Sequence, residues 1–396
     1  MSLAFSLPAP LLRLRPRPCV SRHSLVCTAS PVAAAGLVLP PSPIPSRFDS
    51  GAISGAAVQR YLSDEGARFV MWYAGRPLTW ASSAKAPPGT SHGLVGLALS
   101  SDGITWDRVE GPLEAHSVLA PNDDWWTFDT VHLSLGSVSI DSNDMVRADA
   151  GVYFMYYGGG NAEKVTVGGA ELAGARMAIG VAISKDGEHF TRIEGEHPSG
   201  AVLERGDEGA FDELFVAGPC VVRAKTGASN AGKYVMHYFS FDERRGRFAI
   251  GQAISKDGLR FERAKNEPVI TGEGCAFAER GVSRCCVVER AAGRFVIFVE
   301  CVDGEGVHRI AMAESSDCQT WGDLKVVLEP GEAEAWDCKG VSHPSVVQMD
   351  DDQMRLYYRG RGSEYDAEKG TGSGIGVAAS NGADWTRLER ILTEQQ

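Results

Sequence analysis

The sequence predicts an all-β protein, a five-bladed β-propeller with four-stranded antiparallel blades. Two observations carry this prediction: a short motif recurs along the chain, and strand-like stretches precede each copy in a fixed order. Self-similarity at a regular interval is typical of repeat architectures, and short aromatic or β-branched runs bounded by turn signals indicate strands. Alternating helical periodicity is missing throughout, which excludes α/β folds.

The recurring motif is Ser-x-Asp-Gly-x-x-aromatic, followed two positions later by Arg. Its copies begin at Ser100, Ser184 and Ser255, with a weaker copy at Ser315 and a shortened copy at Ser380. The Asp-Gly pair predicts a tight hairpin turn between the last two strands of each blade. We therefore expect Asp102, Asp186 and Asp257 to have a structural role.

Three strand-like stretches precede each motif. The first begins with an aromatic residue, usually followed by Asp, and its copies start at Phe48, Phe128, Phe211, Phe277 and Trp336. The second alternates aromatic residues, as in 153–157, and the third is small and apolar, as in 177–183. With one strand after the motif, this order predicts four strands per repeat and one propeller domain over residues 47–392, followed by a tail at 393–396.

Residues 1–46 differ in composition from the rest of the chain. No acidic residue occurs from Met1 to Phe48, whereas Arg, Ser and Pro are frequent. Such a leader resembles a transit peptide, and the segment 24–29 looks like a chloroplast processing region. We expect import into the chloroplast stroma; the alternative is a disordered N-terminal tail.

The charge of the chain limits its partners. Lys and Arg number 39 against 51 Asp and Glu, for a net charge of -12. An acidic chain without a basic block is a poor candidate for binding nucleic acid, and no apolar run is long enough for a membrane span. A small or neutral molecule, such as a carbohydrate, is the expected partner. The cysteines, which include no Cys-x-x-Cys, are expected to be free thiols.

Four repeats carry an Asp directly after the leading aromatic residue, namely Asp49, Asp129, Asp212 and Asp337. Equivalent positions in a propeller converge toward one axis, where mutual repulsion would raise some carboxyl pKa values unless cations intervene. Acid/base work on sugars uses such a pair, one carboxyl protonated and one ionised. The same Asp residues could equally accept hydrogen bonds at a turn in each blade, and both alternatives stay open.

A residue present in every blade is expected to hold the blades together. Residues near the channel that differ from their counterparts in the other repeats are therefore better candidates for a functional role. They are Glu213, Glu279, Arg280, Arg284, His343 and His132. An Arg can hold a carboxylate or phosphate bidentately, and a His can act in acid/base steps or bind a metal. Trp126 could stack on a sugar ring. The alternative is that Arg284 neutralises nearby Asp residues and that His343 and Trp126 are packing residues.

The pattern of Phe/Trp-Asp, Pro, aromatic strand and Ser-x-Asp-Gly motif resembles the five-bladed glycoside-hydrolase-like superfamily of arabinanases, β-xylosidases, invertases and levansucrases, over residues 48–392. In arabinanase-like members the acids usually lie just before the Pro of the inner strand, where this chain has Gly55-Ala56, Leu135-Gly136 and Ala217-Gly218. The segment 340–345 resembles the fifth-blade His motif of arabinanases. That resemblance implies a calcium or other divalent ion near His343 at the channel centre.

Two functions follow from this resemblance and these residues. In the first, the protein is a glycosidase-like, carbohydrate-active protein that hydrolyses or binds a glycoside in the central funnel. Asp49, Asp129 and Glu213 are then the catalytic carboxylates, with Glu213 as general acid, and Arg284 and His343 orient the substrate. In the second, a non-catalytic propeller uses the same funnel to bind a small ligand or a protein partner in the plastid.

Overall fold

The computed structural model describes residues 35–63, 66–78, 93–141, 151–167, 170–224, 232–366 and 371–392. Residues 1–34 of the expected leader and the tail at 393–396 lie outside this range, so plastid import stays a prediction. The described part is all-β, with short 3-10 turns at η2 (Glu114–His116), η4 (Ala276–Ala278) and η5 (Asp350–Asp352). None of its helices is long and apolar enough to cross a membrane.

The described strands pair antiparallel in groups that follow the five sequence repeats, numbered here in chain order. The first repeat holds β2 (Ala52–Ser63), β3 (Gly66–Arg76), β4 (Leu94–Ser100) and β5 (Asp107–Arg108). The second holds β6 (His132–Asp141), β7 (Val152–Gly160), β10 (Met177–Ser184) and β11 (Thr191–Ile193), with a side hairpin of β8 (Lys164–Val167) and β9 (Ala170–Ala173).

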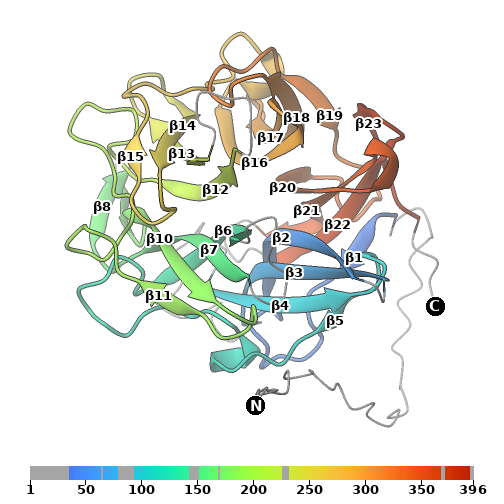
Figure 1. Ribbon diagram of the computed structural model, residues 1–396, viewed down its shortest axis with the longest axis horizontal. Coiled ribbons are helices and arrows are strands. Elements are labelled where there is room, and N and C mark those ends of the chain that lie inside the picture. The colour runs from blue at the N-terminus through green and yellow to red at the C-terminus, as the bar shows by residue number, and fades with distance from the viewer. Residues whose placement is uncertain are drawn as a thin grey trace, which may run out of the picture.

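The remaining groups are built in the same order. The third repeat holds β12 (Ala217–Arg223), β13 (Tyr234–Asp242), β14 (Arg247–Ser255) and β15 (Glu262–Arg263). The fourth holds β16 (Gly281–Ala291), β17 (Arg294–Val302), β18 (His308–Ser315) and β19 (Lys325–Leu328). The fifth holds β20 (Gly340–Gln348), β21 (Met354–Asp366), β22 (Thr371–Asn381) and β23 (Asp384–Arg390). In Figure 1 the groups are arranged around a centre, with β2, β6, β12, β16 and β20 nearest to it.

The sheets differ in one respect from the expected five separate blades. The first two repeats form separate four-stranded sheets, whereas the last three, together with β1 (Leu37–Leu39), form one 13-stranded sheet. The links are two single parallel pairs, Phe248 with Gly281 and His308 with Gly340. Both glycines have positive φ, and a Cβ on either would press against the partner strand. The missing side chain therefore lets each inner strand bond to the preceding repeat.

The N-terminal boundary of the fold lies earlier than residue 46. Leu37–Leu39 form β1, which pairs antiparallel with β22 of the fifth repeat, and Leu39 is 1% exposed. Figure 1 shows the two ends of the described chain side by side here. The expected leader 1–46 thus overlaps the fold, because the apolar run Leu37-Val38-Leu39 supplies an extra strand to the last repeat.

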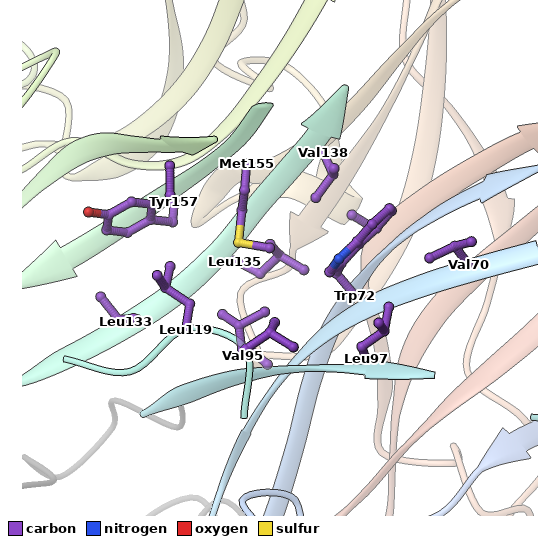
Figure 2. Close-up of a cluster of buried hydrophobic side chains, with 14 of the residues drawn as sticks. Val70, Trp72, Val95, Leu97, Leu119, Leu133, Leu135, Val138, Met155 and Tyr157 are labelled. Atoms are coloured by element: carbon purple, nitrogen blue, oxygen red, sulfur yellow. The ribbon is translucent and has the colours of Figure 1, made fainter. Parts of the chain in front are cut away.

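Five apolar clusters lie between neighbouring repeats. Figure 2 shows the one between the first and second, where Trp72 and Leu97 face Leu135 and Met155. The Trp72 indole also donates to the Gly187 carbonyl of the second repeat at 2.8 Å. A further cluster joins Tyr357 and other residues of the fifth repeat to the first, and so closes the ring. Burial of apolar side chains between sheets is what holds such repeats together.

A second set of contacts joins neighbouring inner strands. Each inner strand has a Val preceded by a small residue or a thiol, in the pairs Ala57-Val58, Ser137-Val138, Cys220-Val221, Cys286-Val287 and Ser345-Val346. The Val N–H donates to the side chain of the preceding repeat from Val58 to Ser345 (3.1 Å), Val221 to Ser137 (3.0 Å), Val287 to Cys220 (3.2 Å) and Val346 to Cys286 (3.4 Å). These thiols, like the other cysteines of the described ranges, are free, as expected.

The Ser-x-Asp-Gly motif forms the predicted turn. Asp102 Oδ1 accepts hydrogen bonds from the backbone N–H groups of Ile104 (2.7 Å) and Thr105 (2.8 Å). Gly103 has a φ of 74°. The same contacts recur at Asp186 and Asp257, which confirms the structural role expected for these residues.

Candidate functional site

The four repeated aspartates each form the same buried unit. In each, Oδ2 accepts one hydrogen bond from a Tyr hydroxyl and one from an Arg Nε, and the Asp is at most 1% exposed. The sets are Asp49 with Tyr73 (2.9 Å) and Arg108 (2.6 Å), Asp129 with Tyr157 (2.9 Å) and Arg192 (2.8 Å), Asp212 with Tyr238 (2.9 Å) and Arg263 (2.8 Å), and Asp337 with Tyr358 (2.9 Å) and Arg390 (2.8 Å). Burial, and then the neighbouring carboxylate, raise the pKa of each Tyr.

The fourth repeat lacks all three members of this unit together. Ala278 stands in the Asp position and Val299 in the Tyr position, and the pairing of Met312 with Lys325 places Leu324 in the Arg position. In the other repeats the Arg also donates to a loop carbonyl, as Arg263 does to Glu204 O at 2.5 Å. A charged residue that is buried needs its partners. The joint loss of all three in one repeat favours the scaffold alternative for these aspartates over the catalytic one.

A β-bulge interrupts every inner strand at an equivalent place. The register shifts lie between Ile53 and Ala56, Leu135 and Ser137, Ala217 and Cys220, Val282 and Cys285, and Ser342 and Ser345. Bulges re-aim side chains and are frequent next to active sites. At this level Arg284 and His343 reach a narrow gap of about 20 Å³, whose other lining residues are small or apolar, among them Gly55, Leu135 and Gly218. His343 has a φ of 53°, a left-handed value that costs energy for a residue with a side chain.

On one side of this gap lies a cavity of about 240 Å³. Its polar lining includes Arg284, Glu300, His308, His343, Arg359 and Arg361, with His132 and Tyr365 at its wall. These side chains come from the second, fourth and fifth repeats. On the other side of the gap the channel widens to about 430 Å³, lined by the later part of the inner strands. We call the 240 Å³ cavity the funnel.

Glu300 connects two histidines in the funnel. Its Oε1 lies 2.5 Å from His308 Nδ1, while its Oε2 accepts the His343 N–H at 3.3 Å and lies 3.5 Å from His343 Nδ1. Burial alone would raise the pKa of this carboxyl. The His308 hydrogen bond and the charges of His308, Arg361 and Arg284 outweigh burial and lower it to about 2. Glu300 is therefore ionised at neutral pH.

All three arginines of the funnel sit against aromatic rings, Arg359 and Arg361 both against Tyr365. Arg284 donates to Leu135 O at 3.2 Å, and its guanidinium lies 5.6 Å from the Phe239 ring centroid. The Arg361 guanidinium lies 5.1 Å from the ring centroid of Tyr365. Burial lowers the pKa of Arg284 to about 10. Burial, and then the repulsion of Arg361, lower the pKa of Arg359 to about 10 as well. Arg284 and Arg359 therefore remain charged at neutral pH.

His132 is uncharged at neutral pH, in contrast to the arginines of the funnel. It is 2% exposed, and its Nε2 lies 2.7 Å from Gly174 O. Burial lowers its pKa, the Gly174 contact opposes this, and the nearby Arg284 charge lowers it further. His132 therefore adds a neutral imidazole to the funnel, and the charge of the site comes from its arginines and Glu300.

The structure brings together three of the predicted site residues, His132, Arg284 and His343. The others lie outside the funnel lining. Glu213 accepts the Gly209 N–H at 2.7 Å within its own loop, and Arg280 is exposed and donates to Gly304 O at 2.7 Å. Glu279 is exposed on the same loop. Trp126 is 39% exposed and lines a separate groove of about 270 Å³ with Asp129.

Five further residues line the funnel that the sequence did not predict, namely Glu300, His308, Arg359, Arg361 and Tyr365. A signal for two of them was present, because the strand pairing aligns Ala74, Gly158, Phe239, Glu300 and Arg359, directly after the repeated Tyr position. Glu300 and Arg359 are the charged residues in this otherwise uncharged set. A charged residue that breaks the repeat in the second strand is thus as informative as one in the first strand.

A calcium ion at His343 does not fit the residues present. Calcium takes six to eight oxygen ligands, whereas the His343 ring meets Ser54 Oγ at 3.1 Å, Ser342 Oγ at 3.2 Å and one carboxylate oxygen of Glu300. Three guanidinium groups line the same cavity and would repel a cation. Within the described ranges no cluster of three or more His, Cys, Asp or Glu side chains could hold a metal.

Gly55 is expected to be required for the position of His343. A Cβ at residue 55 would meet His343 Cδ2 at 2.5 Å, so Gly55→Ala must displace the ring from Ser54 and Glu300. We expect a loss of about 1–3 kcal/mol in the free energy of unfolding, measured by urea denaturation, because a tightly packed site is overfilled. Exposed Gly322, where a Cβ would meet only ordinary contact at 3.5 Å, is the control, with a change below about 0.5 kcal/mol. Equal effects would contradict this packing.

Comparison with known proteins shows the fold. No protein-family model and no curated protein matches the chain. A solved glycoside hydrolase shares 16% identity at a TM-score of 0.60, over 89% of this chain and 92% of that one. An N-acetylgalactosamine deacetylase from F. plautii, in complex with a blood group B trisaccharide, shares 15% identity at a TM-score of 0.57, over 90% of this chain and 97% of that one. An exo-1,5-α-L-arabinanase from a bovine ruminal metagenomic library shares 12% identity at a TM-score of 0.53, over 91% of this chain and 99% of that one. The chain therefore has the propeller-like fold of glycoside hydrolases.

Proposed function

We propose that the protein is carbohydrate-active and holds one sugar unit in the funnel, with the five repeats as five blades of four strands around it. The observation that carries this proposal is the convergence of charged and hydrogen-bonding side chains from three repeats on one cavity. Concave sites with a few convergent polar groups are where small ligands bind. At about 240 Å³ the funnel suits a ligand smaller than a drug-sized molecule, such as a single sugar ring.

The charges favour binding over hydrolysis by a carboxylate pair. Such hydrolysis needs two carboxyl groups across the glycosidic bond, one of them protonated. Glu300 is the carboxylate among the described residues that line the funnel, and its lowered pKa keeps it ionised. Asp49 and Asp129 are held by Tyr and Arg, and Glu213 by its own loop. The solved structures of this fold include both hydrolases and a deacetylase, so the fold itself does not fix the reaction.

In this proposal each residue of the funnel has a role. Glu300 accepts hydrogen bonds from sugar hydroxyl groups with the lone pairs that the histidines leave available. His308 and His343 hold Glu300 in place. Tyr365 and Phe239 give apolar faces against which a sugar ring can pack.

Isothermal titration of neutral and charged monosaccharides tests the proposal. We expect at least one to bind, and we expect Glu300→Gln to weaken that binding at least tenfold, because a charged acceptor is replaced by an amide. Glu213→Gln, outside the funnel, should bind like the wild type. Near-ultraviolet circular dichroism checks that both variants are folded. Weakening by Glu213→Gln and not by Glu300→Gln would overturn the proposal, as would the failure of every sugar to bind.

A further inference from the structure

The funnel carries positive charge in an acidic protein. Arg284, Arg359 and Arg361 line it, and Glu300 is the one carboxylate that the described residues place in its lining, whereas the whole chain has a net charge of -12. Placing several like charges in one partly enclosed cavity is unfavourable unless an opposite charge joins them. An excess of positive charge at this place therefore indicates an anionic group in the ligand.

Glu300 attracts Arg284 and Arg361 but offsets at most one of the three positive charges. Its two oxygens are directed to His308 and His343, at 2.5 Å and 3.3 Å. Arg284 is held by a carbonyl and an aromatic face, and among the described residues it has no ion pair within 4.0 Å. The Nε atom of Arg361 is buried without a hydrogen-bond partner in the described part of the chain. A buried donor without a partner is unfavourable, and a ligand oxygen can relieve this.

The geometry also provides different places in the funnel for an anionic group and for a sugar ring. The guanidinium groups of Arg284 and Arg361 lie against Phe239 and Tyr365, which limits the directions in which each can donate. A guanidinium fork matches the two oxygens of a carboxylate or phosphate. The two aromatic rings and His132, the last of which is neutral, then form a wall for the remainder of the ligand.

From these contacts we infer that the funnel selects an anionic saccharide, a sugar that carries a carboxylate or phosphate group, with Arg284 and Arg361 holding that group. This inference rests on the proposed function, because it names the class of sugar for the same cavity. The arginines act by binding and orienting the ligand, and no covalent step is assigned to them.

The test is a set of titrations of the full chain with matched sugars. Galacturonate is compared with galactose, and glucose 6-phosphate with glucose, while acetate and inorganic phosphate serve as anions without a sugar. We expect one charged sugar to bind at least tenfold more tightly than its neutral partner, and the preferred pair identifies the group as carboxylate or phosphate. Its affinity should fall as salt rises, because the attraction is electrostatic.

Variants locate the effect at the arginine. Arg361→Gln should weaken the charged sugar at least tenfold and change the neutral sugar less than twofold, while Arg361→Lys, which keeps the charge and loses the fork, should fall between them. Exposed Arg280→Gln is the matched control and should bind like the wild type. Melting curves identify any variant that fails to fold, in which case Arg284→Lys, judged by the same ratio of charged to neutral affinity, takes its place.

Each outcome has a distinct meaning. Equal affinity for charged and neutral sugars would overturn this inference and leave the proposed function standing. Free acetate or phosphate binding as tightly as the charged sugar would show an anion site without sugar selectivity, which also overturns it. Failure of every sugar to bind would overturn the proposed function, and this inference with it.

Discussion

Replacing Asp212 with Ala is expected to lower the free energy of unfolding by about 3–5 kcal/mol, the cost of removing one partner from a buried ion pair. Asp212 is 1% exposed and accepts the Tyr238 hydroxyl at 2.9 Å and Arg263 Nε at 2.8 Å. Without it, a buried phenol and a guanidinium lose their common acceptor. Urea denaturation of the two proteins measures the difference.

Asp207→Ala provides the control, because Asp207 is exposed in the preceding loop. We expect it to change stability by less than about 0.5 kcal/mol. At temperatures where the protein is folded, Asp212→Ala should leave sugar affinity close to that of the wild type. A loss of stability below about 1 kcal/mol, with loss of sugar binding, would return Asp212 to the ligand site and contradict the scaffold role.

Acid should remove the stabilisation that Glu300 supplies. Its pKa is about 2 in the folded protein against 4.5 when unperturbed, so the folded state favours the ionised form. That contribution, about 3 kcal/mol, is fully present above pH 4.5 and is lost as the pH falls through 2. We therefore expect Glu300→Gln to be less stable than the wild type at pH 7, with the difference narrowing between pH 5 and pH 2.

Urea denaturation at a series of pH values measures this effect. Exposed Glu305→Gln, on the loop between β17 and β18, is the control and should follow the wild type at every pH. A constant difference between Glu300→Gln and the wild type from pH 7 to pH 2 would contradict an ionised Glu300 held by His308 and the arginines.

The strand order could be predicted from the sequence because short segments within each repeat determine its strands and turns. The Ser-x-Asp-Gly turn is fixed by bonds within a few residues, as at Asp102 and Ile104, so the motif itself contains the information. The joining of three repeats into one sheet could not be predicted in this way. It depends on whether Gly281 and Gly340 approach strands of the preceding repeat, which is a matter of tertiary packing.

The candidate site was predicted in part, for a related reason. Arg284, His343 and His132 break the repeat in the first strand and lie in the funnel. Glu300 is brought beside His343 by packing between the fourth and fifth repeats. His308 begins β18 and Arg361 lies within β21 opposite Gly340, and neither has a repeated neighbour to mark it. The Asp repeat was ambiguous because its Tyr and Arg partners lie far along the chain, Tyr238 and Arg263 for Asp212.

The most direct measurement is a crystal structure with the tightest-binding sugar. We predict the sugar in the funnel, with its anionic group on Arg284 and Arg361 and a hydroxyl group on Glu300, and with the Asp–Tyr–Arg units unchanged. A sugar bound instead in the groove of Trp126 and Asp129, or at the opposite mouth of the channel, would contradict the assignment of the ligand site.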